Sequence, residues 1–158
     1  MTQPRRLALA AALATALALA VPPAFSQAPA KPQAHETSID GVTAEILEAS
    51  RKEGVLTLKV RYRNNSDTAA AFPLYRNWDD KDYYVTAGST KMLVLKDSKG
   101  AGIATPHGAH GETQVDIKPR GSFLFWAKYP APPEATKKVS FFHPHSPPIE
   151  DIPITDSK

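Results

Sequence analysis

The sequence predicts an all-β domain, either a sandwich or a barrel, that follows a cleavable signal peptide. Apolar and polar residues alternate in short segments that recur roughly every 8–12 residues, with turn-forming residues between them. No long segment after residue 28 has the period of about 3.6 residues that marks an amphipathic helix. The first 28 residues have the charge and hydropathy pattern of an export signal.

The segment 1–28 contains the three parts of a secretory signal peptide. Arg5 and Arg6 supply a positive start, an apolar run rich in Ala and Leu covers residues 7–21, and small residues at 26–28 form a cleavage site. The apolar run is about fifteen residues long, shorter than the roughly 20 that cross a bilayer core. We therefore expect cleavage, a periplasmic or secreted location, and no membrane span in the mature chain.

Composition limits the class of protein that follows the leader. Removing 28 of 158 residues leaves 130, enough for one domain. The full chain has 19 basic and 16 acidic residues, and the leader carries Arg5 and Arg6 but no acid, so the mature balance is 17 − 16 = +1. This near-neutral charge argues against a nucleic-acid partner. Cysteine is absent, which excludes disulfides, thiol catalysis and thiolate metal sites.

The mature chain is expected to begin with a spacer and a first strand. Residues 29–40 are rich in Pro, Ala and polar side chains, which predicts a disordered spacer before a domain at 41–158. Alternating apolar residues predict a strand at 42–49, and polar residues with a glycine at 50–54 predict a turn.

The clearest strand covers residues 55–63. Its apolar members Leu56, Leu58, Val60 and Tyr62 alternate strictly with polar residues. This period of two predicts one buried face and one solvated face, as in an antiparallel sheet. The Asn- and Ser-rich segment 64–67 follows as a turn.

The remaining elements are short strands separated by turn residues. Pro153 lies inside the last of them, and because proline cannot donate to a central ladder, we expect that strand at a sheet edge. The aromatic strand contains Trp126, which we expect in the core. The expected strands are 70–72, 83–85, 91–96, 102–104, 112–117, 122–129, 138–142 and 149–154.

Five segments carry a family resemblance: residues 60–67 (VRYRNNSD), 93–100 (LVLKDSKG), 118–122 (KPRGS), 125–133 (FWAKYPAPP) and 147–154 (PPIEDIPI). Together they resemble bacterial exported immunoglobulin-like domains of unknown function. That group is similar to a secreted mycobacterial-antigen class and to the module preceding the peptidoglycan-binding part of some outer-membrane-protein-A-like proteins. The resemblance implies an immunoglobulin-like antiparallel β-sandwich of seven to nine strands in an envelope setting, and it brings no catalytic motif.

Four histidines form two motifs that could hold a metal ion. His107 and His110 are three apart in a glycine-rich stretch, and His143 and His145 are two apart, on one side of an extended chain. Neutral imidazoles bind Cu²⁺ or Zn²⁺, and Glu112 could add a carboxylate if both motifs lie at the same end of the domain. The alternative is that these are solvated loop histidines, and the family resemblance favours this alternative because it rests on strands.

An aromatic-rich segment offers a second candidate site. Trp78, Tyr83 and Tyr84 surround the acidic stretch 79–82, which lacks the ligand order and the glycine of a calcium loop. Exposed Tyr and Trp would suit a partner protein or a carbohydrate ring. The alternative is that these aromatic residues pack within the core.

The sequence predicts a protein that is not an enzyme. It has no G-x-S-x-G elbow, no H-E-x-x-H motif and no glycine-rich phosphate loop. The predicted function is an exported module that binds a protein or envelope component through its loops or an edge strand. The alternative is a periplasmic metal-binding protein that uses the histidines of two loops, with copper or zinc as the only cofactor implied.

Overall fold

The computed structural model describes residues 32–74, 82–105 and 114–157. The chain divides into two units, Met1–Ala30 and Lys31–Lys158, and every described residue belongs to the second. The signal peptide predicted at 1–28 lies outside the described residues. It therefore stays a prediction.

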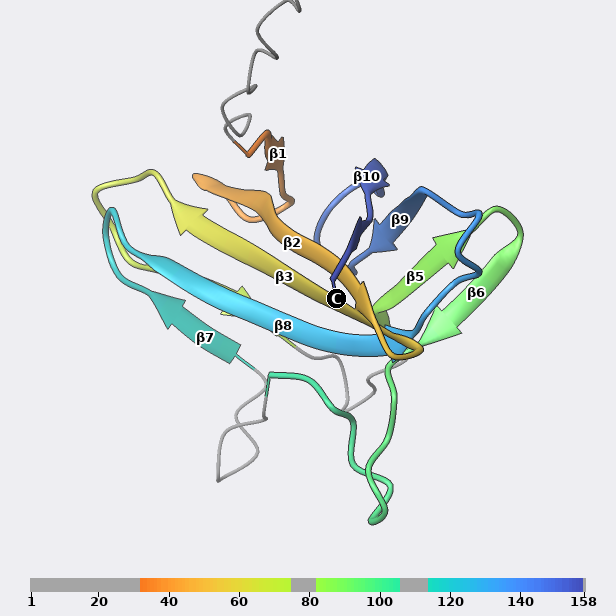
Figure 1. Ribbon diagram of the computed structural model, residues 1–158. Helices are drawn as coiled ribbons and strands as arrows, with labels where there is room; N and C mark the ends of the chain where they lie inside the picture. The colour runs from red at the N-terminus through yellow and green to blue at the C-terminus, as the bar shows by residue number, and fades with distance from the viewer. Residues whose placement is uncertain (1–31, 75–81, 106–113, 158) are drawn as a thin grey trace, which may run out of the picture. The chain divides into compact units, whose positions relative to one another are not determined.

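The described residues form eleven strands and no helix, which confirms the all-β class (Figure 1). The largest sheet contains β1 (Ala34–Glu36), β2 (Val42–Lys52), β3 (Val55–Asn64) and β8 (Ser122–Pro130) in that order, with β11 (Thr155–Asp156) also on β2. A four-stranded sheet has the order β10 (Ile149–Pro153), β9 (Lys138–Phe142), β5 (Tyr84–Ala87) and β6 (Thr90–Leu93). The strands β4 (Ala70–Pro73) and β7 (Gln114–Ile117) pair separately. Neighbouring strands are antiparallel, except that β11 is parallel to β2.

Strands β2 and β3 form a long hairpin closed by a two-residue turn. Lys52 pairs with Val55, so only Glu53 and Gly54 lie between the strands. Both have positive φ, 49° and 77°, as a type I′ turn requires. The turn predicted over residues 50–54 was therefore too long, because the ladder continues through Ser50, Arg51 and Lys52.

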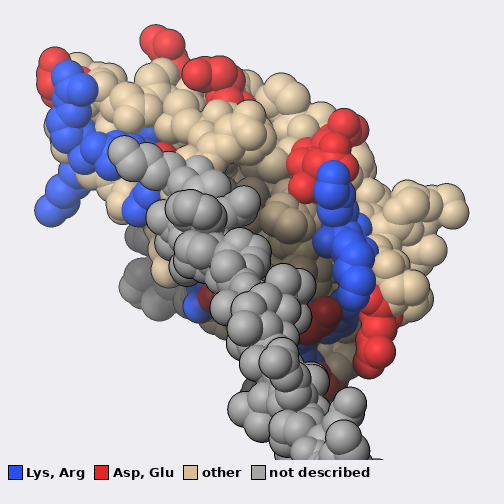
Figure 2. Space-filling view, turned by 45° about the horizontal axis from the view of Figure 1, so that its top comes forward, with Lys and Arg blue, Asp and Glu red and all other residues tan. Residues whose placement is uncertain are grey.

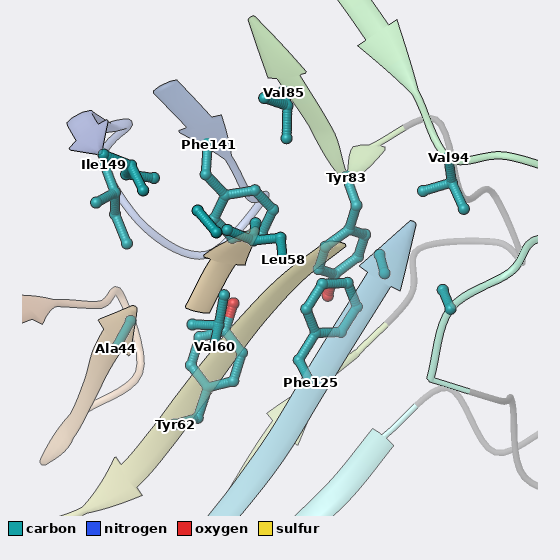
Figure 3. Packing of buried hydrophobic residues seen from close by; sticks show 14 of the residues in the cluster. Ala44, Leu58, Val60, Tyr62, Tyr83, Val85, Val94, Phe125, Phe141 and Ile149 are labelled. Atoms are coloured by element: carbon teal, nitrogen blue, oxygen red, sulfur yellow. The ribbon is translucent and has the colours of Figure 1, made fainter. Parts of the chain in front are cut away.

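The inner faces of the two larger sheets meet in one core (Figure 3). From β3 come the four alternating residues predicted from sequence, and all four are fully buried. Phe125 of β8 lies 6.1 Å from Phe141 of β9, ring centroid to centroid, and so bridges the two sheets. Around this contact pack Val85 of β5 and Ile149 of β10.

Trp126 is not a core residue, which corrects the sequence prediction. Strand residues alternate between faces, and Phe125 and Ala127 point inward on β8. Trp126 therefore lies on the outer face, half-buried, opposite Lys59 of β3. The strand was predicted correctly, but the wrong set of alternate residues was assigned to its buried face.

The ends of the domain contain more structure than predicted. Ala34–Glu36 forms β1 and pairs with β2 from Thr43 to Glu45, so the spacer predicted at 29–40 is wrong for these residues. The two-residue strand β11 was also missed, which raises the count above the predicted seven to nine. Pro153 lies on the edge strand β10, as predicted.

The β2–β3 turn generates a stability prediction. A glutamate with φ of 49° is strained, whereas asparagine adopts the left-handed region readily. We expect Glu53→Asn to stabilise the protein by roughly 0.5–1 kcal/mol. Gly54→Ala should destabilise it through conformation alone, because a Cβ there would meet nothing within 4 Å. Denaturant unfolding measures both, and a Glu53→Asn variant no more stable than wild type would contradict the assignment.

Candidate functional site

A buried histidine forms a hydrogen bond with a buried tyrosine inside the core. His143 is 5% exposed, and its Nε2 atom lies 2.8 Å from the hydroxyl oxygen of Tyr83. The Tyr83 hydroxyl donates to the backbone carbonyl of Leu74. The Nδ1 atom of His143 accepts a 3.0 Å hydrogen bond from the backbone N–H of His145. The turn after β9 is thereby tied to Leu74 and Tyr83.

These contacts determine the protonation of His143. Because Nδ1 accepts a hydrogen bond, the single ring proton is on Nε2 and is donated to Tyr83. The rings of Tyr62 and Phe72 lie 5.1 and 5.4 Å from the imidazole, centroid to centroid. Burial, with a smaller contribution from the neighbouring His145, lowers the pKa of His143 to about 3. The imidazole is therefore neutral near pH 7.

This arrangement changes the metal hypothesis. Both ring nitrogens of His143 have hydrogen-bond partners inside the protein, so the residue is a core group and not the ligand predicted from sequence. His145 is half-buried and packs its ring against Phe72. His107 and His110 lie outside the described residues, where their role stays a prediction. Among the residues that the structure describes, no group of three His, Asp or Glu side chains could hold a metal ion.

The predicted aromatic site is also altered. Tyr83 is fully buried, with its ring 4.7 Å from that of Phe125, so it is not the exposed binding residue predicted from sequence. Tyr84 is half-buried, and its ring stacks on Phe142 at 4.6 Å with an interplanar angle of 9°. The Lys91 ammonium lies 3.6 Å from the centroid of the Tyr84 ring. Trp78 lies outside the described residues.

Tyr84 is consequently a poor platform for a sugar ring. Strand parity places Tyr84, Phe142 and Leu93 on the face of the four-stranded sheet opposite to the core. A carbohydrate needs an open aromatic face, but Tyr84 is held between Phe142 and Lys91. We call Leu93, Tyr84 and Phe142 the outer row. The row keeps apolar surface exposed through Leu93, which is 42% exposed.

Three of the four edges of the larger sheets are covered or interrupted. The outer edge of β2 pairs with β1 at one end and with β11 at the other. Lys128 and Trp126 of β8 exchange backbone hydrogen bonds of 2.7–2.9 Å with residues 95–105. The edge strand β10 has a register shift between Ile149 and Ile152, and Pro153 removes a donor.

The edge strand β6 differs from these three. It ends the four-stranded sheet, and the described residues include no strand paired to its far side. The two-residue turn at Gly88 and Ser89 makes Ala87–Thr90 the hydrogen-bonded pair that closes the β5–β6 hairpin. The backbone N–H and C=O groups of Lys91 and Leu93 therefore point away from β5.

One basic side chain lies on the same edge. Lys91 of β6 is exposed, and the exposed residues Lys96 and Lys99 follow beyond the end of the strand at Leu93. The acidic residue among them is Asp97, whose carboxylate accepts hydrogen bonds from the backbone N–H groups of Lys99 and Ala101. The edge therefore combines outward backbone groups, one exposed leucine and local positive charge.

Elsewhere the charges are mixed. On the face shown in Figure 2, basic and acidic side chains lie in small interspersed groups. The described residues visible on that face do not form a continuous basic surface of the kind that binds nucleic acid. Among the described residues there is also no helix long and apolar enough to cross a membrane.

Sequence reasoning missed a buried arginine. The Arg51 side chain is 7% exposed, and its Nε atom lies 2.6 Å from Asp156 Oδ1. Its other nitrogens donate to the backbone carbonyls of residues 132, 133, 134 and 136. One guanidinium thus fastens both the loop after β8 and strand β11 to β2, and it lowers the pKa of Asp156. No local motif signals this role, because every partner is distant in sequence.

Comparisons with protein-family models, with curated protein sequences and with solved structures found no match to this chain.

The buried imidazole predicts loss of stability in mild acid. The pKa of His143 is about 3 when folded and about 6.5 when unfolded, so between these values only the unfolded chain binds the proton. Stability should fall by up to about 1.4 kcal/mol per pH unit below pH 6.5. Urea unfolding at pH 7, 6 and 5 measures the slope. His143→Phe should flatten it, and His35→Gln should not; equal slopes in all three proteins would contradict the assignment.

Substitutions of the two members of the Arg51–Asp156 ion pair are predicted to have unequal effects on stability. Arg51→Ala leaves several backbone carbonyls without their donor, whereas Asp156→Asn removes an ion pair whose carboxylate is 54% exposed. We expect the denaturant midpoint to fall several-fold further in Arg51→Ala than in Asp156→Asn. Equal shifts would mean that the ion pair, and not the set of carbonyls, is the main contribution.

Proposed function

We propose that this chain is an exported, non-enzymatic immunoglobulin-like module that binds a partner protein of the cell envelope at the β6 side of its four-stranded sheet. The leader pattern at 1–28 supports export. The two sheets packed on one core, together with the sequence resemblance, support an immunoglobulin-like arrangement.

The observation that carries the proposal is the contrast between β6 and the other sheet edges. Exposed apolar residues with unpaired strand backbone are features of a recognition surface, and natural proteins usually cover or interrupt such edges. In this chain β2, β8 and β10 are treated in that way, while β6 leaves Leu93, the end member of the outer row, exposed.

The polar groups support binding more than catalysis. His143 is the strongest acid–base candidate among the described residues, but it is buried, and both its nitrogens are engaged within the protein. A general acid or base must reach a substrate atom. This favours a module that recognises its partner through a surface.

Site-specific crosslinking tests the proposal. Benzoylphenylalanine in place of Leu93 is expected to crosslink, in the source cells, to one discrete envelope protein. The matched control carries the same group in place of Leu47, which is 41% exposed and lies on β2 of the other sheet. A product from position 93 alone supports the proposal. Identical products from both positions, or none from position 93, would overturn it.

A further inference from the structure

We infer that β6 binds an extended, acidic segment of a partner protein as an added strand. The inference rests on the proposed function and specifies its mode of binding and its partner chemistry. It follows from three features of one edge: the direction of the backbone groups, the side chains beside them, and the charge.

The backbone supplies the first feature. Lys91 and Leu93 direct their N–H and C=O groups away from β5, as deduced from the hairpin turn. Leu95 lies two residues further along, outside the strand, and agrees with this direction, since its N–H donates to Lys128 and its C=O accepts from Ile103. The chain thus already forms inter-strand bonds on this side after β6, and an added strand would continue the same pattern over residues 90–93.

The side chains supply the second feature. An added strand would lie about 4.8 Å from β6, with alternate side chains on each face. On the outer face, one residue of the added strand would lie beside Lys91, and the residue two positions along from it would lie beside Leu93. The first position favours a carboxylate, and the second favours an apolar group that extends the outer row from Tyr84 and Leu93.

The charge supplies the third feature and argues against a second copy as the partner. Pairing β6 with β6 of another copy would bring the Lys91 side chains of two four-residue strands near each other. Like charges across neighbouring strands are destabilising. The acidic edge β10 carries Glu150 and Asp151, but its register shift and Pro153 disrupt the ladder that pairing needs. A different protein with an acidic extended segment fits this edge better.

Synthetic peptides test the inference on the purified mature protein. The probe is an acetylated, amidated peptide of alternating Glu and Val, and its counterpart replaces each Glu with Lys. Binding is followed by backbone amide shifts in ¹⁵N spectra. We expect saturable binding of the acidic peptide, with the largest shifts at residues 90–95 and weaker binding at higher salt. The basic peptide should bind at least about tenfold more weakly.

Two variants separate backbone pairing from charge. Lys91→Thr removes the charge and keeps the outward N–H, whereas Lys91→Pro removes both; an edge position whose N–H faces solvent tolerates proline. We expect binding to weaken about tenfold further in Lys91→Pro than in Lys91→Thr, because a donor is lost and the strand is blocked. If Lys91→Pro fails to fold, a probe peptide N-methylated at alternate residues makes the same comparison on the unaltered protein.

The outcomes are distinct. Equal binding of acidic and basic peptides, equal binding of Lys91→Pro and Lys91→Thr, shifts confined to residues outside 84–96, or no saturable binding would each overturn the inference. The crosslink from position 93 would still stand in those cases, because a partner can contact Leu93 without adding a strand. Loss of the crosslink with retained peptide binding would instead reject the proposed envelope partner.

Discussion

The fold depends on the apolar contact between the two larger sheets, because the chain has no cysteine with which to link them. Phe125 of β8 provides the centre of this contact, with its ring 4.7 Å from Tyr83 and 6.1 Å from Phe141. Full burial of one large apolar side chain contributes roughly 1.5–3 kcal/mol. About 130 residues can build such a core without cross-links, provided that most polar groups inside it have a partner.

Two buried polar residues meet that condition in different ways. His143 remains neutral and shares its proton with Tyr83, so the core contains a hydrogen-bonded imidazole and no charge. Arg51 keeps its charge, because backbone carbonyls and Asp156 surround the guanidinium at the end of β2. Each residue joins segments that are far apart in sequence. Together they hold the two segments that flank β9. His143 holds the turn after the strand, and Arg51 holds the loop before it.

The sequence was informative where one strand has one solvated face. The pattern of β3 was read correctly because its polar residues alternate without exception. The buried face of β8 was predicted wrongly, because Phe123 to Trp126 are all apolar. The sequence pattern therefore does not show which alternate residues point into the core. The site predictions for His143 and Tyr83 were wrong for a related reason. Whether His143 and Tyr83 face solvent or core depends on tertiary structure, and hydrogen-bonded partners 60 residues apart leave no local signal.

The same limit explains why β6 did not stand out. Its sequence predicts an ordinary strand, and only the order of the sheet makes it an edge. Lys91 then has two consequences at that edge. It disfavours pairing between identical copies, since their lysines would meet, and it favours an acidic strand from another protein. A single charged residue can therefore disfavour self-association at an edge that no described strand covers, while leaving that edge available to one class of partner, as the proposed mode of binding requires.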